Sequence, residues 1–175
     1  MYNHIAMLLN IVNAKNQEGT PVEFDVNVSL SEDLLSDRGY KINGDAKVVG
    51  TMLYEDRELT TEAQATVNVD VVCDNCGCEF TRDFTVDVNE KFVEAEFKSE
   101  EEYTLNLSSV DLTKPVEDNL LSNIPTRVLC KEDCKGLCPY CGKDLNNQVC
   151  NCEAIIESEE QFDNPFNKLN KLGDN

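Results

Sequence analysis

The sequence is poor in the residues and motifs on which most enzymes depend. It has one histidine, no glycine-rich phosphate-binding loop and no H-E-x-x-H motif. His4 lies beside the N-terminus, where a solvated side chain is expected, so most Ser–His and Cys–His nucleophile schemes are excluded. The acids Asp83 and Asp87 are interpreted as solvated strand residues. We therefore expect no enzyme activity, no catalytic residue and no small-molecule substrate.

Long apolar runs are also missing. No stretch approaches the roughly 20 residues that a helix needs to cross a bilayer, so no membrane association is predicted. Residues 1–19 have no basic region, too short an apolar run and no cleavage-site pattern, which is not typical of a secretory signal. The sequence therefore favours a cytoplasmic protein.

Cations are scarce. The chain has 15 Lys and Arg residues against 34 Asp and Glu residues, a formal net charge of -19. Residues 1–112 hold 23 acids and 8 bases, whereas residues 113–145 hold 5 of each. Such a surface repels phosphate backbones and favours a basic protein partner. A local basic face would need the cations between residues 127 and 143, which are Arg127, Lys131, Lys135 and Lys143.

Cysteine, in contrast, is plentiful. Two C-x-x-C-G turns begin at Cys73 and Cys138, and the intervals C-x3-C and C-x-C supply two further pairs. Thiolates at these spacings are typical of structural zinc sites. The predicted metal ligands are Cys73, Cys76, Cys130, Cys134, Cys138, Cys141, Cys150 and Cys152. A redox-active dithiol and structural disulfides are the alternatives, and an odd count of nine in a cytoplasmic chain favours zinc. Cys78 is interpreted as the spare cysteine.

Alternating apolar and polar residues predict strands over 22–30, 46–54, 64–73, 78–88 and 103–107. The first C-x-x-C-G turn then lies at the tip of a long β-hairpin. A helix is predicted to begin near Thr113 and to end before Pro125. The expected fold is α+β, with an antiparallel, barrel-like sheet, few helices and a C-terminal cysteine-rich zinc module.

Three regions are expected along the chain. Residues 1–112 form a β-rich domain with the hairpin turn at 73–78, residues 113–155 form a helix with the zinc module packed on it, and residues 156–175 form an acidic-to-amphipathic tail. The tail carries an apolar stripe at helical spacing, made of Phe162, Phe166, Leu169 and Leu172. This stripe either packs on the domain or docks on a partner.

The order of these parts resembles a known family. It consists of a strand that ends in C-x-x-C, a DLT-type helix start, the run C-x3-C-x-G-L-C-P-x-C-G-x-x-L-N-x-x-x-C-x-C, and a closing N-P-F-x-x-L-x-x-L. This pattern is similar to the bacterial large ribosomal RNA subunit accumulation protein family. The resemblance implies a non-enzymatic role in 23S rRNA synthesis, processing or accumulation during large-subunit biogenesis. A basic ribosomal protein or assembly factor is the expected partner, with rRNA contacted through the zinc module.

The resemblance also implies how the cysteines pair. It groups Cys73 and Cys76 with Cys130 and Cys134, and leaves the other four ligands for a second site. Pairing of the two C-x-x-C-G turns with each other stays open as an alternative. At Asn75 the family usually has arginine, which puts in doubt any RNA contact at that turn. The competing function is a cytosolic thiol-redox or metal-sensing protein that uses its C-x-x-C motifs.

Overall fold

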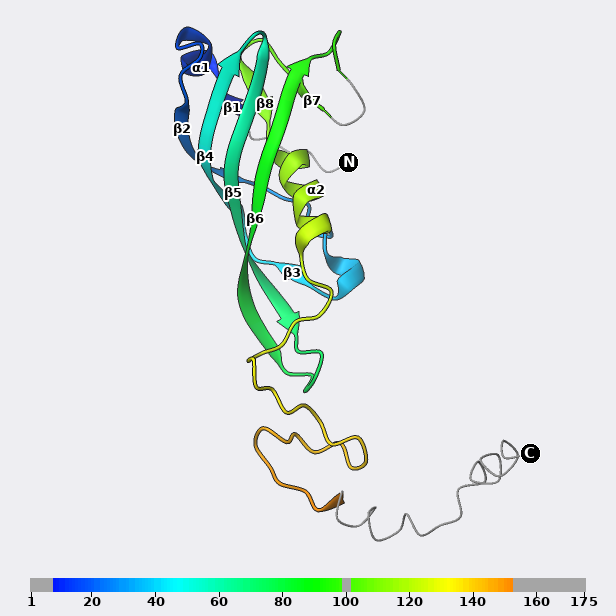
Figure 1. The fold of residues 1–175 in the computed structure, drawn as a ribbon. Coiled ribbons are helices and arrows are strands. Elements are labelled where there is room, and N and C mark those ends of the chain that lie inside the picture. Colours follow the sequence, from blue (N-terminus) through cyan, green and yellow to red (C-terminus); the bar gives the residue numbers. More distant parts are fainter. Residues whose placement is uncertain (1–7, 99–101, 153–175) are drawn as a thin grey trace, which may run out of the picture. The chain divides into compact units, whose positions relative to one another are not determined.

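A computed structural model of the chain describes residues 8–98 and 102–152 (Figure 1). His4 and the predicted stripe of the tail lie outside the described residues. The elements, in chain order, are β1 (Leu8–Asn10), α1 (Val12–Asn16), β2 (Val22–Val28), the 3-10 helix η1 (Ser36–Arg38), β3 (Lys41–Ile42), β4 (Ala46–Glu55), β5 (Glu58–Val72), β6 (Glu79–Glu94), β7 (Tyr103–Leu105), β8 (Ser109–Asp111) and α2 (Thr113–Asn123).

The main sheet has the strand order β2-β4-β5-β6-β7, and β3 pairs with β5 outside this path. All pairs in this sheet are antiparallel except β6 with β7, which is parallel. β5 and β6 form the predicted hairpin, paired from Glu58↔Val93 to Val72↔Glu79. β4 pairs with β5 only as far as Thr66. The two hairpin strands therefore continue well beyond β4 toward the turn at residues 73–78.

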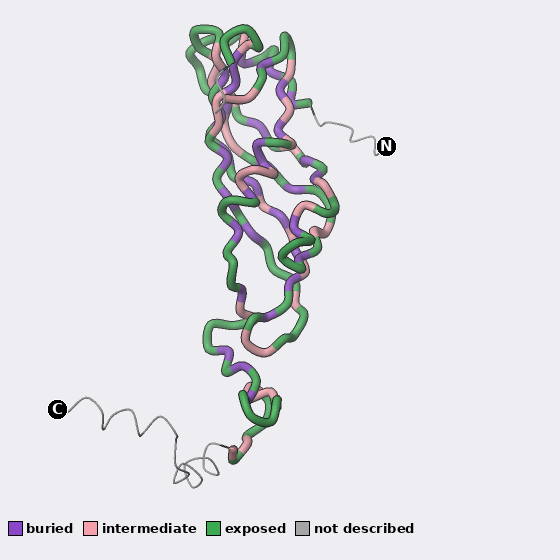
Figure 2. Tube along the Cα trace, turned by 90° about the vertical axis from the view of Figure 1, so that its right-hand side faces the viewer, coloured by how far each residue is buried: buried purple, intermediate pink, exposed green. Residues whose placement is uncertain are grey.

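Among the described residues, the sheet does not close, so the expectation of a barrel-like sheet was wrong. β2 and β7 lie at its two ends and do not pair with each other. The buried face is covered by α2, whose Val116 and Leu120 are fully buried, and by Ile124, which directly follows the helix and is 3% exposed; all three belong to the same core as the strands. Buried and exposed residues alternate along the strands (Figure 2). Alternation reveals that a strand buries one face, but it does not reveal what covers that face.

Ser31 and Arg38, which lie between β2 and β3, hold α2 at Glu117 and at its C-terminal end. Glu117 accepts hydrogen bonds from the backbone N–H and the hydroxyl of Ser31, at 2.9 and 2.7 Å. The Arg38 guanidinium donates to the carbonyls of Ile124 and Leu121, at 2.8 and 2.9 Å, so it satisfies acceptors that the end of a helix leaves free. At the other end, the carboxylate of Asp111 accepts from the N–H of Thr113 at 2.8 Å.

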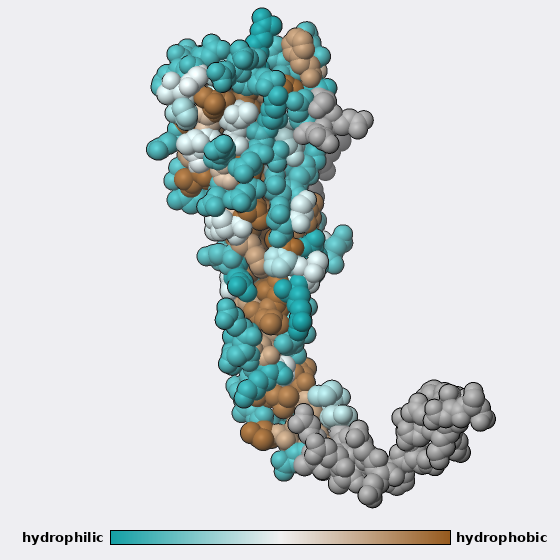
Figure 3. Space-filling view, in the orientation of Figure 1, coloured by the Kyte–Doolittle hydropathy of each residue, from teal (hydrophilic) through white to brown (hydrophobic). Residues whose placement is uncertain are grey.

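The chain divides into two compact units. The first contains Met1–Val72 and Glu79–Val128, and the second contains Cys73–Cys78 and Leu129–Asn175. α2 belongs to the first unit, together with the sheet. Hydrophilic side chains cover much of the sheet face seen in Figure 3. Within the described ranges, no helix is long and apolar enough to cross a membrane.

Candidate metal centre

The second unit contains two turns with the same backbone structure. In the first turn, the N–H of Gly77 donates to the carbonyl of Cys73, and the N–H of Cys73 donates to the carbonyl of Cys78, both at 2.9 Å. In the second turn, Gly142 and Cys138 make the equivalent bonds, at 2.9 and 2.8 Å. Both glycines are left-handed, with φ of 69° and 70°, a conformation that a side chain would strain. The C-x-x-C-G sequence therefore folds twice into one turn that presents two thiols.

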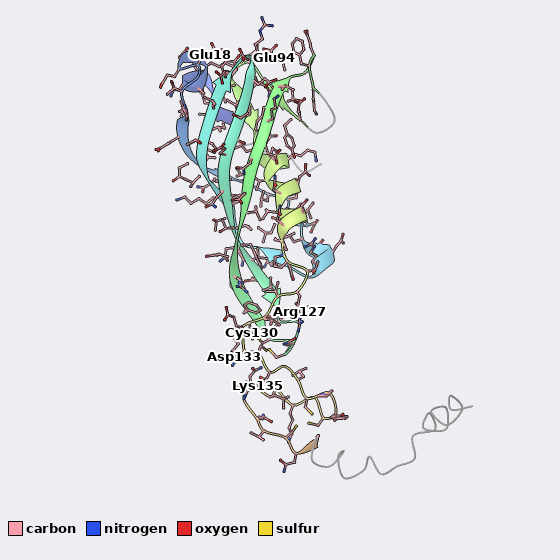
Figure 4. All side chains as sticks on the ribbon, in the orientation of Figure 1. Glu18, Glu94, Arg127, Cys130, Asp133 and Lys135 are labelled. Carbon is pink, nitrogen blue, oxygen red and sulfur yellow. The ribbon has the colours of Figure 1, made fainter. Side chains whose placement is uncertain are left out.

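The first cysteine cluster combines this turn with residues more than fifty positions later. Its members are Cys73, Cys76, Cys130 and Cys134, whose sulfur atoms all lie within 4.8 Å of one another. The Sγ atoms of Cys73 and Cys134 are 3.7 Å apart, as are those of Cys76 and Cys130. Figure 4 labels Cys130, Asp133 and Lys135 on the segment that supplies the later pair.

These separations match a tetrahedral thiolate site. With zinc–sulfur bonds of about 2.3 Å, the edge of a tetrahedron of sulfurs is about 3.8 Å, whereas a disulfide bond is about 2.0 Å. All nine cysteines are free thiols. The sulfur positions therefore fit a four-coordinate zinc ion and do not fit disulfides.

The second cluster consists of Cys138, Cys141, Cys150 and Cys152, again with all sulfurs within 4.8 Å. A β-bridge between Leu137 and Asp144 closes the chain around the second turn. The structure therefore groups the cysteines as the family resemblance implies. Neither cluster combines the two C-x-x-C-G turns with each other.

Two asparagines, Asn75 and Asn146, hold the segment of the first cluster that contains Cys134, a structural role that the sequence did not indicate. Asn75 donates from its side chain to the carbonyl of Cys134 at 3.1 Å, and its own carbonyl accepts from the N–H of Leu137 at 3.1 Å. Asn146 approaches the Cys134 sulfur with its amide nitrogen at 3.5 Å and accepts from the N–H of Lys135 at 3.0 Å. Asn75 thus has a structural role in its turn. The D-x-N sequence at Asp144–Asn146 is typical of a local turn in which a side chain accepts a backbone hydrogen bond. The contact of Asn146 with Cys134, twelve positions earlier, depends on the fold and could not be read from this local pattern.

One thiol in each cluster is acidified. Burial acts to raise the pKa of Cys73, but the backbone N–H groups of Cys130, Cys76 and Asn75 outweigh it and bring the pKa to about 6. The N–H groups of Cys141 and Tyr140 likewise hold the pKa of Cys138 at about 6. The turn that presents the two thiols therefore also favours one thiolate, because its N–H groups point at the sulfur.

Other thiols of the clusters hold their protons more tightly. Burial, followed by hydrogen bonds with Cys134 and Cys73, raises the pKa of Cys130 well above its ordinary value. A hydrogen bond with Cys141 and then burial raise the pKa of Cys152 to about 12. Without a cation, negative charges at such close range repel one another. A divalent cation reverses this preference, because it stabilises all four thiolates.

Cys78 lies next to the first cluster without belonging to it. Its side chain is exposed, and its sulfur is 3.4 Å from that of Cys76. The hydrogen bond with Cys76, followed by burial, raises the pKa of Cys78. A thiol with a raised pKa has little of the reactive thiolate form near neutral pH.

The cations and acids considered in the sequence lie outside the two clusters. Tyr140, in the second C-x-x-C-G turn, is 62% exposed. Lys131 lies 3.9 Å from the carboxylate of Asp133. The acids Asp83 and Asp87 are exposed on β6, where they accept hydrogen bonds from Asn68 and Gln64, at 2.6 and 3.1 Å. They are bound by neighbouring amides and do not face each other across a cavity.

Comparison with known proteins identifies one family. A family model described as the large ribosomal RNA subunit accumulation protein YceD matches residues 61–173. No curated protein and no solved structure matches the chain significantly. The matched range includes β5 from Thr61 onward, β6, α2 and all eight clustered cysteines. The chain belongs to the large ribosomal RNA subunit accumulation protein YceD family.

Proposed function

We propose that this protein is a non-enzymatic, cytoplasmic binding factor in bacterial ribosome biogenesis, that it supports the accumulation of 23S rRNA, and that two structural zinc ions hold its second unit. The observation that carries this proposal is the family match, which covers both cysteine clusters. Each cluster offers four sulfurs to one ion, and a zinc site closed by four thiolates has no open position for a substrate. The clusters therefore support a scaffold better than a catalytic centre.

The charge of the chain favours a basic protein as the direct partner. The described part of the second unit carries four acids and three bases, and each zinc ion bound by four thiolates would add a net charge of about −2. This unit would then be anionic, and so is the sheet. A direct rRNA contact would have to rest on exposed side chains such as Tyr140 and Lys135 against that charge. A ribosomal protein or assembly factor rich in Lys and Arg meets no such penalty.

Co-sedimentation tests the proposed function. The chain is expected to sediment with precursors of the large ribosomal subunit, and its deletion is expected to lower the ratio of 23S to 16S rRNA. Ultraviolet cross-linking in the same fractions distinguishes protein from RNA as the direct contact, with protein expected. Absence of the chain from every ribosomal fraction, together with an unchanged rRNA ratio in the deletion strain, would refute the proposal.

A thiol-redox or metal-sensing function is the second candidate, because a fifth thiol lies beside the first cluster. Alkylation of the zinc-loaded chain, mapped by mass spectrometry, separates the two functions. The scaffold predicts slow modification at Cys78, which is exposed but has a raised pKa, and protection of the eight clustered cysteines. A redox or sensing role predicts rapid modification of Cys138 or Cys141, so that result would favour the second candidate.

Zinc binding is expected to release protons. Cys130, Cys150 and Cys152 have raised pKa values and are protonated near pH 7 in the metal-free chain, yet zinc binds thiolates. Calorimetric titration of the metal-free chain with zinc, in buffers of different ionisation enthalpy, should show release of at least these three protons per chain. The apparent affinity should fall as the pH is lowered. Binding without proton release would show that these thiols are not ligands.

A further inference from the structure

β6 is paired along nearly its whole length on one side but only at its C-terminal end on the other. On the first side it pairs with β5 from Glu79 to Val93, whereas on the other side β7 pairs only with Phe92, Val93 and Glu94. In the described part of the chain, no other strand lies along residues 79–91 on this outer side. A strand edge of this length presents a row of backbone N–H and C=O groups to any strand that can approach it.

The segment Thr81–Asn89 of this edge carries two acids, Asp83 and Asp87, and one exposed base, Arg82. Phe84, Val86 and Val88 are buried and anchor the strand to the core. The residues between them point away from the core, and the carboxylates of Asp83 and Asp87 are fixed by the amide hydrogen bonds from β5. The two carboxylates therefore lie on the solvent-facing side of the sheet, beside this edge.

Space remains between this edge and α2. A hollow of about 310 Å³ is lined by Thr85, Val86, Asp87 and Asn89 of β6 and by Asn119 and Asn123 of α2. Asn119 of α2 donates a hydrogen bond to the carboxylate of Glu90 on β6, and the hollow lies next to this contact, toward Thr85. The hollow leaves β6 open to solvent beside Thr85, Asp87 and Asn89.

The other end strand of the sheet is a weaker candidate. β2 is about half as long as β6, and the carboxylate of Asp25 on β2 is 3.3 Å from the ammonium group of Lys47. A second copy of this chain is also disfavoured at β6, because like charges would lie opposite one another across the new pair. An extended segment with Lys or Arg at alternate positions places opposite charges there instead.

We propose that the outer edge of β6, from Thr81 to Asn89, binds an extended, Lys- or Arg-rich segment of a partner protein as an additional strand. This inference rests on the proposed function for the basic character of the partner. Backbone hydrogen bonds would supply the affinity, and the carboxylates beside the edge would select cations at alternate positions.

The test uses the full-length, zinc-loaded chain and a nine-residue peptide of alternating Lys and Val. Hydrogen exchange should show peptide-dependent protection of amides within residues 81–89. The N–H groups of an extended peptide alternate between its two edges, and those of one edge can be replaced by N-methyl groups. Methylation of the edge that faces β6 should weaken binding about tenfold or more, because it removes several backbone hydrogen bonds. Methylation of the opposite edge should have little effect.

Variants of the protein test the charge. Asp83→Asn combined with Asp87→Asn should weaken binding about three- to tenfold and reduce its salt dependence. The matched control, Glu23→Gln combined with Asp25→Asn on β2, should leave binding unchanged. Equal losses in the two variants would mean that only the overall charge matters and would overturn the assignment to β6.

Other outcomes also refute the inference. Absence of binding, protection outside β6, or indifference to methylation of either edge would rule out strand addition. Amides of the β6 edge that are protected from exchange without peptide would mean that another strand already occupies the edge. Protection that depends on protein concentration would identify a second copy of the chain, and protection that does not would identify a segment of the same chain. Any of these results, combined with normal co-sedimentation with large-subunit precursors, refutes this inference alone and leaves the proposed function standing.

Discussion

Replacement of Cys134 by serine is expected to lower the zinc content of the purified chain from two equivalents to one. Cys134 is buried, and its sulfur lies 3.7 Å from that of Cys73, so its loss removes one corner of the first cluster. Binding of a structural zinc ion contributes on the order of 10 kcal/mol of folding free energy. The first cluster should therefore lose its ion and its order together, while the second cluster keeps both.

Metal analysis by mass spectrometry measures the zinc content, and hydrogen exchange over residues 129–137 reports the loss of order. Cys78→Ser is the matched control, because this thiol lies near the first cluster but is not one of its four members. The control should retain two zinc ions and the exchange pattern of the unaltered chain. Two ions in Cys134→Ser would contradict the ligand set, and one ion in Cys78→Ser would mean that Cys78 is a ligand.

Leu120→Ala is expected to lower the free energy of unfolding of the first unit by about 2–5 kcal/mol. Leu120 is fully buried where α2 covers the sheet, so the substitution leaves a cavity between the helix and the strands. Urea denaturation followed by circular dichroism measures the change.

Leu121→Ala supplies the matched control on the same helix. Leu121 is 39% exposed, and the bond that it accepts from Arg38 uses its backbone carbonyl, which the substitution keeps. Its effect should stay within about 0.5 kcal/mol. Similar losses in the two variants would contradict the covering role of α2 in the core.

Much of the sheet could be predicted, because its strands bury one face and expose the other. The beginning of β5 was missed by several residues, since the alternating positions at its start include Thr61, a polar residue that is only 2% exposed. Thr61 reaches backbone carbonyls of β6 with its hydroxyl at 3.4 and 3.5 Å, so a polar residue occupies a core position. Hydropathy alone cannot identify such a position.

The cysteine spacing predicted four pairs of thiols, but not how the pairs combine. Spacing describes local geometry, whereas the combination depends on which segments the fold brings together. Cys76 and Cys130 are 54 positions apart and meet in one cluster. The family resemblance indicated this grouping, and the supporting contacts of Asn75 and Asn146 became visible only in three dimensions.

The positions of the two clusters along the chain set an order of assembly during translation. Cys73 and Cys76 are synthesised before α2, and at about 5–20 residues per second the 54 residues that separate Cys76 from Cys130 take several seconds to add. For that time the hairpin turn of the nascent chain presents an open pair of thiols. The second cluster draws its four sulfurs from residues 138–152 and closes almost as soon as they emerge. If both clusters bind zinc as proposed, the earliest cysteines of a newly made chain would depend on a reducing environment with available zinc for longer than the last ones.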